Sequence, residues 1–286
     1  MQRVISPLRE AGMRFSRDGC AFLAQALAFN ALFAVFPLVV LILSAASYVF
    51  AHAQQRMLIF FNTINPALHD FVAQNLATYI FGRGISSIVA LAFLVWSGKN
   101  LFMGLAYALD RALDVPKGRP LVHNIALSIV MLPVMGVVLV IAMALPVVLS
   151  IFMALTDAAD RRYVTHVGAY VVSIALVFAV SMVLYRFLPN RKLSWGFALP
   201  GATFTALVWP FVQVAFAQYT LHVNFSHIYG ALSVPLVLLL WFYLVGSVFL
   251  FGAEFCAAWA GQQGKAHVAA LIDSIEPTLV ETTAKR

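Results

Sequence analysis

The sequence predicts an all-α polytopic membrane protein, a helical bundle with about six transmembrane helices. Of its 286 residues, 63% are hydrophobic and only 10% are charged, whereas a soluble domain has about 45–50% apolar and about 25% charged residues. The core of a soluble chain this long could not bury so many apolar side chains. The apolar residues also gather into runs that exceed the roughly 20 residues needed to cross a bilayer as a helix.

Residues 1–20 precede the first apolar run and carry four arginines. Val4, Leu8, Ala11 and Phe15 recur at helical spacing, which predicts a short amphipathic helix lying on the membrane surface. The apolar run that follows is too long for the hydrophobic region of a signal peptide, and we interpret it as an uncleaved anchor.

Six apolar runs are long enough to span the membrane. Residues 54–82, between the first two runs, are interrupted by polar side chains, and we expect one or two interfacial helices there, on the outer side. The runs and this segment form one membrane domain, 21–260, followed by a cytoplasmic C-terminal tail, 261–286. The predicted spans are 21–50, 85–109, 122–155, 167–187, 195–219 and 228–259.

The positive charges predict the orientation of the chain. Most of the 18 Lys and Arg residues lie in alternate segments that include both termini. Because positively charged segments stay in the cytoplasm, both termini are expected to be cytoplasmic. The net charge of +7 is then explained by contact with anionic lipid headgroups, and no nucleic-acid partner is expected.

Several segments occur in an order and spacing that identify a family. They are LAFNALFAVFPL, VWSGKNLF, RALDVPKGRPLVHN, LYRFLPNRKLSWGFALPGATFTALVW and HIYGALSVPLVLLLWFYLVGSVFLFGAEF. Through them the chain resembles the YihY / virulence factor BrkB family over about residues 20–260. The resemblance implies a six-helix protein of the bacterial inner membrane. It also implies a role in transport, including lipid or envelope-related export, or in resistance to killing by serum.

The same family has been linked by name to a tRNA-processing nuclease, ribonuclease BN. A metal-dependent nuclease needs clustered His and carboxylate ligands, but the seven histidines here are scattered. His222 and His227 are either a metal-binding pair or ordinary interfacial residues. The sequence contains no Walker loop, Gly-x-Ser-x-Gly or His-Glu-x-x-His motif. We therefore expect no catalytic residues, no cofactor and no metal site.

Ionisable groups inside a membrane are candidate functional residues. Lys99, followed by Asn100, lies near the middle of the second predicted span, where it either lines a cavity or extends its stem toward a boundary. Gln213 either lines a polar route or hydrogen-bonds between helices. Glu254 lies in the inner third of the last span. It is either a proton-coupling carboxylate or a fixed partner of a cytoplasmic-side cation such as Arg111 or Arg186.

Four glycines are predicted to allow close packing between helices: Gly98, Gly104, Gly246 and Gly252. The leading hypothesis is a transporter-like protein for an amphiphilic or anionic compound such as a lipid. Its pathway would be formed by Lys99, Asn100, Gln213 and Glu254. The alternative is a non-transporting scaffold, or an envelope-assembly or serum-resistance factor, acting as a homo-oligomer or with an envelope protein. A polar cavity reaching Lys99 would favour transport, and a dry interior would favour the scaffold.

Overall fold

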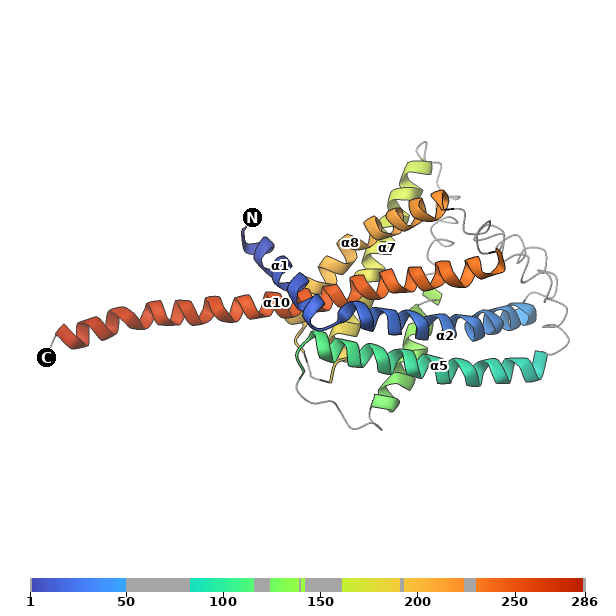
Figure 1. The fold of residues 1–286 in the computed structure, drawn as a ribbon, viewed down its shortest axis with the longest axis horizontal. Coiled ribbons are helices and arrows are strands. Elements are labelled where there is room, and N and C mark those ends of the chain that lie inside the picture. The colour runs from blue at the N-terminus through green and yellow to red at the C-terminus, as the bar shows by residue number, and fades with distance from the viewer. Residues whose placement is uncertain are drawn as a thin grey trace.

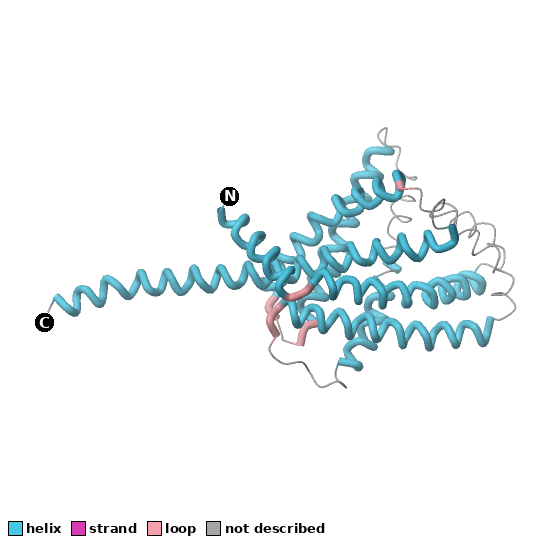
Figure 2. The backbone as a smooth tube through the Cα atoms, viewed as in Figure 1, coloured by secondary structure: helices cyan, strands magenta, loops and turns pink. Residues whose placement is uncertain are grey.

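The structure is a computed structural model that describes residues 2–49, 83–115, 124–138, 140–141, 161–190, 193–223 and 230–284. Every regular element in these ranges is a helix (Figure 2). Five helical stretches are long and apolar enough to cross a membrane, and a shorter apolar helix covers Asn124–Val138. The five are Cys20–Ile42, Ile88–Ala112, Tyr170–Phe187, Trp195–His222 and Ser233–Gly261. The predicted fold class, an all-α polytopic membrane bundle, is confirmed.

Most helices begin and end close to the predicted bounds. The third predicted span, 122–155, corresponds in its described part to Asn124–Val138, and the predicted interfacial segment 54–82 lies outside the described residues. The predicted tail, 261–286, continues the last helix through Ala284. The labelled helices are α1 (Gln2–Arg17), α2 (Cys20–Val49), α5 (Arg83–Ala112), α7 (Arg161–Phe187), α8 (Trp195–His222) and α10 (Ser233–Ala284), with a 3-10 turn at Gly230–Leu232.

The helices are arranged in two groups that meet at α10. Figure 1 shows α2, α5 and α10 running side by side, while α7 and α8 cross them at an angle. Helix α10 contacts both α2 and α8, and α7 packs on α8. The short helix α1 lies against α10 at one end of the bundle, and both chain termini emerge at this end (Figure 1). The elements brought together at this end therefore come from the beginning, middle and end of the chain.

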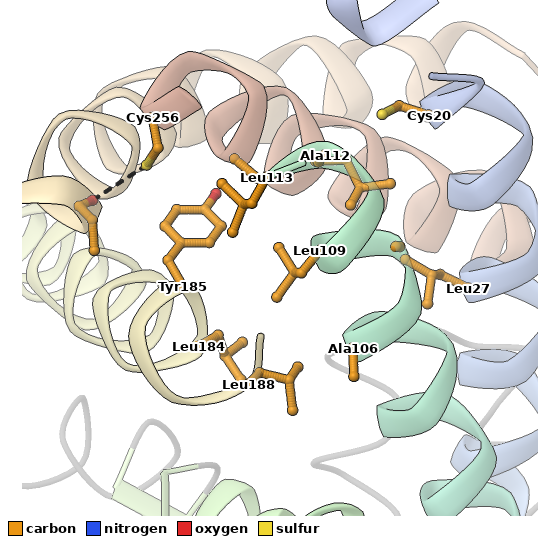
Figure 3. Packing of buried hydrophobic residues seen from close by; sticks show 14 of the residues in the cluster. Cys20, Leu27, Ala106, Leu109, Ala112, Leu113, Leu184, Tyr185, Leu188 and Cys256 are labelled. Carbon is orange, nitrogen blue, oxygen red and sulfur yellow. Dashed lines mark hydrogen bonds between the residues drawn. The ribbon is translucent and has the colours of Figure 1, made fainter. Parts of the chain in front are cut away.

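The core is built mainly from small side chains, while large apolar side chains point outward. Ala106 and Ala112 are fully or almost fully buried in the main cluster (Figure 3), and so are Ala24 and Ala202. By contrast, Phe22 and Phe211 expose 73% and 75% of their surface. Hydrocarbon accepts such side chains, and small residues at the contacts allow helix backbones to approach closely. The distribution is that of a bundle whose outer surface faces lipid.

Helices α8 and α10 cross closely at two glycines, Gly201 and Gly252. A Cβ atom on Gly201 would overlap the carbonyl oxygen of Gly252 and the sulfur of Cys256. A Cβ atom on Gly252 would overlap the Thr205 and Tyr185 hydroxyl oxygens. The other predicted packing glycines have softer surroundings: a Cβ atom would meet the Leu132 side chain at Gly98, and would make only ordinary contacts at Gly104 and Gly246.

Tyr185 connects three helices beside this crossing. Its hydroxyl donates to the Phe249 carbonyl oxygen at 2.6 Å and lies 2.9 Å from Thr205 Oγ1. Replacing Tyr185 with Phe removes both hydrogen bonds and keeps the ring, so we expect a loss of about 0.6–2 kcal/mol in unfolding free energy. Thermal unfolding of the purified variant in detergent measures the loss. Thr203→Val is the control, because Thr203 is exposed and, within the described part of the chain, its hydroxyl bonds to the Leu199 carbonyl oxygen of its own helix.

Candidate functional site

Helix α1 forms over the predicted N-terminal segment, and its apolar face rests on protein. Pro7 and Ala11 are buried, whereas Met13 is 59% exposed. Ala11 packs with Phe255 and Ala258 of α10, and the rings of Phe15 and Phe251 lie 5.8 Å apart. The spacing of apolar residues thus predicted the helix, which was expected to lie on the membrane surface. In the structure its apolar side chains contact α10.

A two-residue turn joins α1 to α2. Gly19 adopts a left-handed backbone with φ of +68°, a conformation that glycine reaches without a steric penalty. Its amide donates to the Ser16 carbonyl oxygen at 3.3 Å, and α2 begins at the next residue, Cys20. This turn places the last residues of α1 beside the first residues of α2 and the middle of α10.

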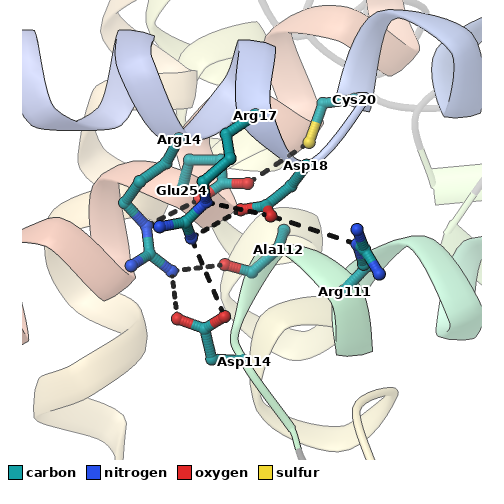
Figure 4. Close-up of polar contacts among 8 residues, drawn as sticks. All are labelled: Arg14, Arg17, Asp18, Cys20, Arg111, Ala112, Asp114 and Glu254. Carbon is teal, nitrogen blue, oxygen red and sulfur yellow. Dashed lines mark hydrogen bonds and ion pairs between the residues drawn. The ribbon is translucent and has the colours of Figure 1, made fainter.

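Glu254 of α10 lies under α1 and is 0% exposed. Arg14 Nε donates to Glu254 Oε2 at 2.9 Å, and the Cys20 thiol donates to Glu254 Oε1 at 3.3 Å (Figure 4). A buried carboxylate without a partner costs several kcal/mol. The charge of Glu254 is therefore compensated by a cation from a helix about 240 positions earlier in the chain.

The same guanidinium also binds the end of α5. Arg14 Nη2 donates to Asp114 Oδ2 at 2.7 Å and to the Ala112 carbonyl oxygen at 3.3 Å. Burial lowers the pKa of Arg14, but the hydrogen bonds to Asp114 and Glu254 raise it more, so its pKa lies above the ordinary value. Arg14 is permanently charged and ties three helices, α1, α5 and α10, to one another.

A cleft of about 790 Å³ opens beside this cluster. Charged side chains of both signs line the cleft and form ion pairs with one another. Arg17 Nη2 lies 3.1 Å from Asp18 Oδ2, and Arg111 Nε lies 4.0 Å from Asp18 Oδ1. The hydrogen bond to Asp18 raises the pKa of Arg17 above its ordinary value. The cleft is therefore a charged opening at the end of an apolar bundle. Its lining residues are Arg17, Asp18, Tyr107, Asp110, Arg111, Asp114 and Val115.

Asp110 connects the cleft to the turn between α7 and α8. The Asn190 backbone amide donates to Asp110 Oδ1 at 2.8 Å, and the Asn190 side-chain amide donates to Asp110 Oδ2. Asn190 is the last residue of the Phe-Leu-Pro-Asn segment noted in the sequence. This contact fixes the second helix group against the cleft.

The structure does not gather the four predicted pathway residues into one site. Lys99 and Asn100 are half-buried on α5, and Lys99 forms no hydrogen bond or ion pair with the described part of the chain. Ala112, which contacts the Glu254 cluster, lies about 20 Å further along the same helix at 1.5 Å per residue. Gln213 is half-buried on α8. The Glu254 cluster therefore lies at one end, and Lys99 lies deeper along the bundle.

The cations proposed from the sequence as partners of Glu254 have other neighbours. Arg111 faces Asp18, and the guanidinium of Arg186 stacks 4.1 Å from the ring centre of Trp195. The described residues contain no group of three or more His, Cys, Asp or Glu side chains arranged to hold a metal ion.

The chain is similar to a family of membrane proteins and to several individual relatives. The virulence factor BrkB family matches residues 11–271. The ribonuclease-like protein YfkH of Bacillus subtilis is 30% identical over 179 residues, which cover 60% of this chain and 64% of that protein. A UPF0761 membrane protein of Aliivibrio fischeri is 29% identical over 257 residues, covering 88% and 82% of the two chains. The match thus spans just under two thirds of YfkH. No solved structure matches the chain.

Proposed function

We infer that this chain, which belongs to the virulence factor BrkB family of integral membrane proteins, is a transporter-like protein for an amphiphilic or anionic compound such as a lipid. The observation that supports this proposal is the charged cleft beside the fully buried Glu254, in a bundle whose buried residues are mostly apolar. Charged groups are costly inside a membrane, and those present usually serve a pathway.

The cleft suits a headgroup attached to an apolar chain. Its wall offers arginines and aspartates, and Tyr107 on the same wall is 64% exposed. Large apolar side chains on the outer face of the bundle provide a surface for an acyl chain. The cleft is lined by residues from the α1–α2 connection and the end of α5, and both termini emerge at this end of the bundle (Figure 1). We propose that this end faces the cytoplasm of a bacterial cell and that the protein lies in the inner membrane, because the termini and the loops predicted on their side of the membrane carry most of the Lys and Arg residues.

The path from the cleft would continue along α5 toward Lys99 and Asn100, with Gln213 on α8 as a further polar residue. Lys99→Met keeps most of the side-chain stem but removes the charge, so we expect it to lower lipid flux by at least about tenfold, a change of 1.4 kcal/mol in barrier height. The measurement is translocation of a fluorescent phospholipid in vesicles that contain the purified protein, scored by quenching with dithionite.

Two further variants make this measurement specific. Lys99→Arg retains the positive charge and should retain flux, while Gln218→Ala changes an exposed polar residue of α8 and serves as a control for handling and reconstitution. Full flux in Lys99→Met protein that inserts and folds normally would remove Lys99 from the pathway.

A scaffold remains the second candidate because α10 continues beyond the apolar stretch Ser233–Gly261 to Ala284. Figure 2 shows this part projecting away from the bundle, where it offers a helix to another protein. A scaffold predicts no flux for any lipid and a stable co-purifying protein that is lost when residues 262–286 are deleted. A transporter predicts that flux persists in the purified protein without any partner.

We also propose that the chain is not an enzyme, although one relative is named ribonuclease-like. A metal-dependent nuclease needs several ligands around its ions, and the described residues offer no such group. The protein, purified in detergent, is expected to leave a precursor tRNA intact in the presence of Mg²⁺, Mn²⁺ or Zn²⁺. Cleavage that follows the protein through two orthogonal purification steps would overturn this expectation.

A further inference from the structure

We propose that Glu254 is a binding site for the cationic amine of an amphiphile, and that α1 closes this site by placing Arg14 on the carboxylate. The proposal rests on the proposed function in one respect, because it takes the cleft as the place where an amphiphile enters the protein. It adds the chemical class of the headgroup and the element that must move.

Helix α1 is attached in a way that lets it move as a unit. Only Asp18 and Gly19 separate it from α2, and Gly19 already adopts a backbone conformation that most residues avoid. Its packing contacts are concentrated on α10, through Ala11 and Phe15. The main buried cluster below α1 is formed by α2, α5, α7, α8, α10 and the helix Asn124–Val138, and α1 contributes the partly buried Phe15 at its edge.

The charge of Glu254 controls when α1 can leave. If Arg14 withdrew and no other cation replaced it, Glu254 would lose the charge that compensates its carboxylate. The open state is therefore favoured only when another cation takes the place of the guanidinium. A ligand shifts such an equilibrium by the difference between its affinities for the two states.

The composition of the cleft decides which ligand can do this. Arg14 and Arg17 both belong to α1 and would move with it. Among the residues that the structure describes, the charged groups left around the opening are then Asp18, Asp110, Asp114 and Glu254 on the acidic side and Arg111 on the basic side. This excess of carboxylates attracts an amine. Arg111, with its side chain 56% exposed, can contact a phosphate, so the site fits a lipid headgroup that carries both an amine and a phosphate.

The movement of α1 can be measured with two cysteine reporters. Ala11 is 0% exposed at the α1–α10 contact, whereas Met13, two positions away, is 59% exposed. In a background with Cys20→Ser and Cys256→Ser, Ala11→Cys reports the opening of α1, and Met13→Cys serves as the matched control. Each protein is placed in nanodiscs of phosphatidylglycerol, and the rate of modification by a water-soluble maleimide is measured.

Two lipids that differ only at the amine test the chemistry. Lysophosphatidylethanolamine is expected to raise the labelling rate at position 11 by about tenfold or more, since a population shift of that size needs a tenfold preference for the open state. N-acetylated lysophosphatidylethanolamine, which lacks the cation, should leave the rate unchanged, and neither lipid should alter labelling at position 13. An equal response to both lipids, or no response to either, would overturn the proposal.

Variants of the Arg14–Glu254 ion pair test whether the lipid response depends on this carboxylate, and hydrogen exchange provides a second measurement of the opening. Glu254→Gln, combined with Arg14→Gln to keep a neutral hydrogen-bonding pair, should abolish the response to the amine lipid. If Ala11→Cys does not fold, hydrogen exchange of the α1 amides in the unmodified protein reports the same opening. A lipid response without flux would leave the site standing and remove transport, whereas flux without a lipid response would remove the site and leave transport standing.

Discussion

Replacing Arg14 with Ala is expected to lower the free energy of unfolding by about 3 kcal/mol. Removing one partner of a buried ion pair costs about 3–5 kcal/mol, because the other charge stays buried. The lower value applies here, since the side chain of Arg14 is 14% exposed while that of Glu254 is fully buried. The loss also includes the contacts of Arg14 with Asp114 and Ala112. Thermal unfolding in detergent, followed by circular dichroism, provides the measurement.

A surface variant and a double variant separate the contribution of the buried charge. Arg17→Ala, on the same helix, removes an arginine whose side chain is 60% exposed, and it should change stability little. Arg14→Gln combined with Glu254→Gln leaves no unpaired charge and should recover much of the loss of Arg14→Ala. If Arg14→Ala were no less stable than Arg17→Ala, water or another cation would have to reach Glu254 in the folded protein.

Gly252→Ala should be the most destabilising of the single alanine substitutions at the predicted packing glycines. The new Cβ atom would overlap the hydroxyls of Tyr185 and Thr205, which are bonded to each other across the α7–α8 contact. Overpacking of a tight contact costs about 1–3 kcal/mol, and here it also separates a hydrogen-bonded pair.

Gly246→Ala is the matched control on the same helix. Its Cβ atom would lie 3.5 Å from Ala24, an ordinary contact, and alanine favours a helix over glycine. We expect no loss of stability in Gly246→Ala and a clear loss in Gly252→Ala, both measured by thermal unfolding. Equal stabilities for the two variants would show that the α8–α10 crossing is looser than the structure indicates.

Hydropathy was sufficient to predict the fold class and the approximate positions of the spans. Long apolar runs have few alternatives to a membrane helix, so the ends of α2 and α5 lie within a few residues of the predicted ones. The continuation of α10 past Gly261 was not predicted. Residues beyond the last apolar run carry no hydropathy signal, and hydropathy was the property from which the helix ends were predicted.

The candidate site was only partly predictable. Glu254 was identified because a carboxylate in an apolar run needs compensation, but its partner Arg14 lies 240 positions away. Several arginines occur near the same predicted boundary, and no spacing rule selects one of them. The position of helix α1 could not be predicted either. An apolar face on a helix fits lipid and protein equally well, and only the folded structure shows that it packs on α10. The packing glycines also look alike in the sequence, although their surroundings differ in the structure.

The length of α10 has a mechanical consequence. Its 52 residues correspond to about 78 Å at 1.5 Å per residue, and the part beyond Gly261 accounts for about 35 Å of this. Glu254 lies seven positions before Gly261, near the point from which this arm extends. A tilt of α10 by about 10° there would displace the far end of the arm by about 6 Å for its 35 Å length. A small change in the direction of α10 near the ion pair would thus be enlarged at the far end of the arm.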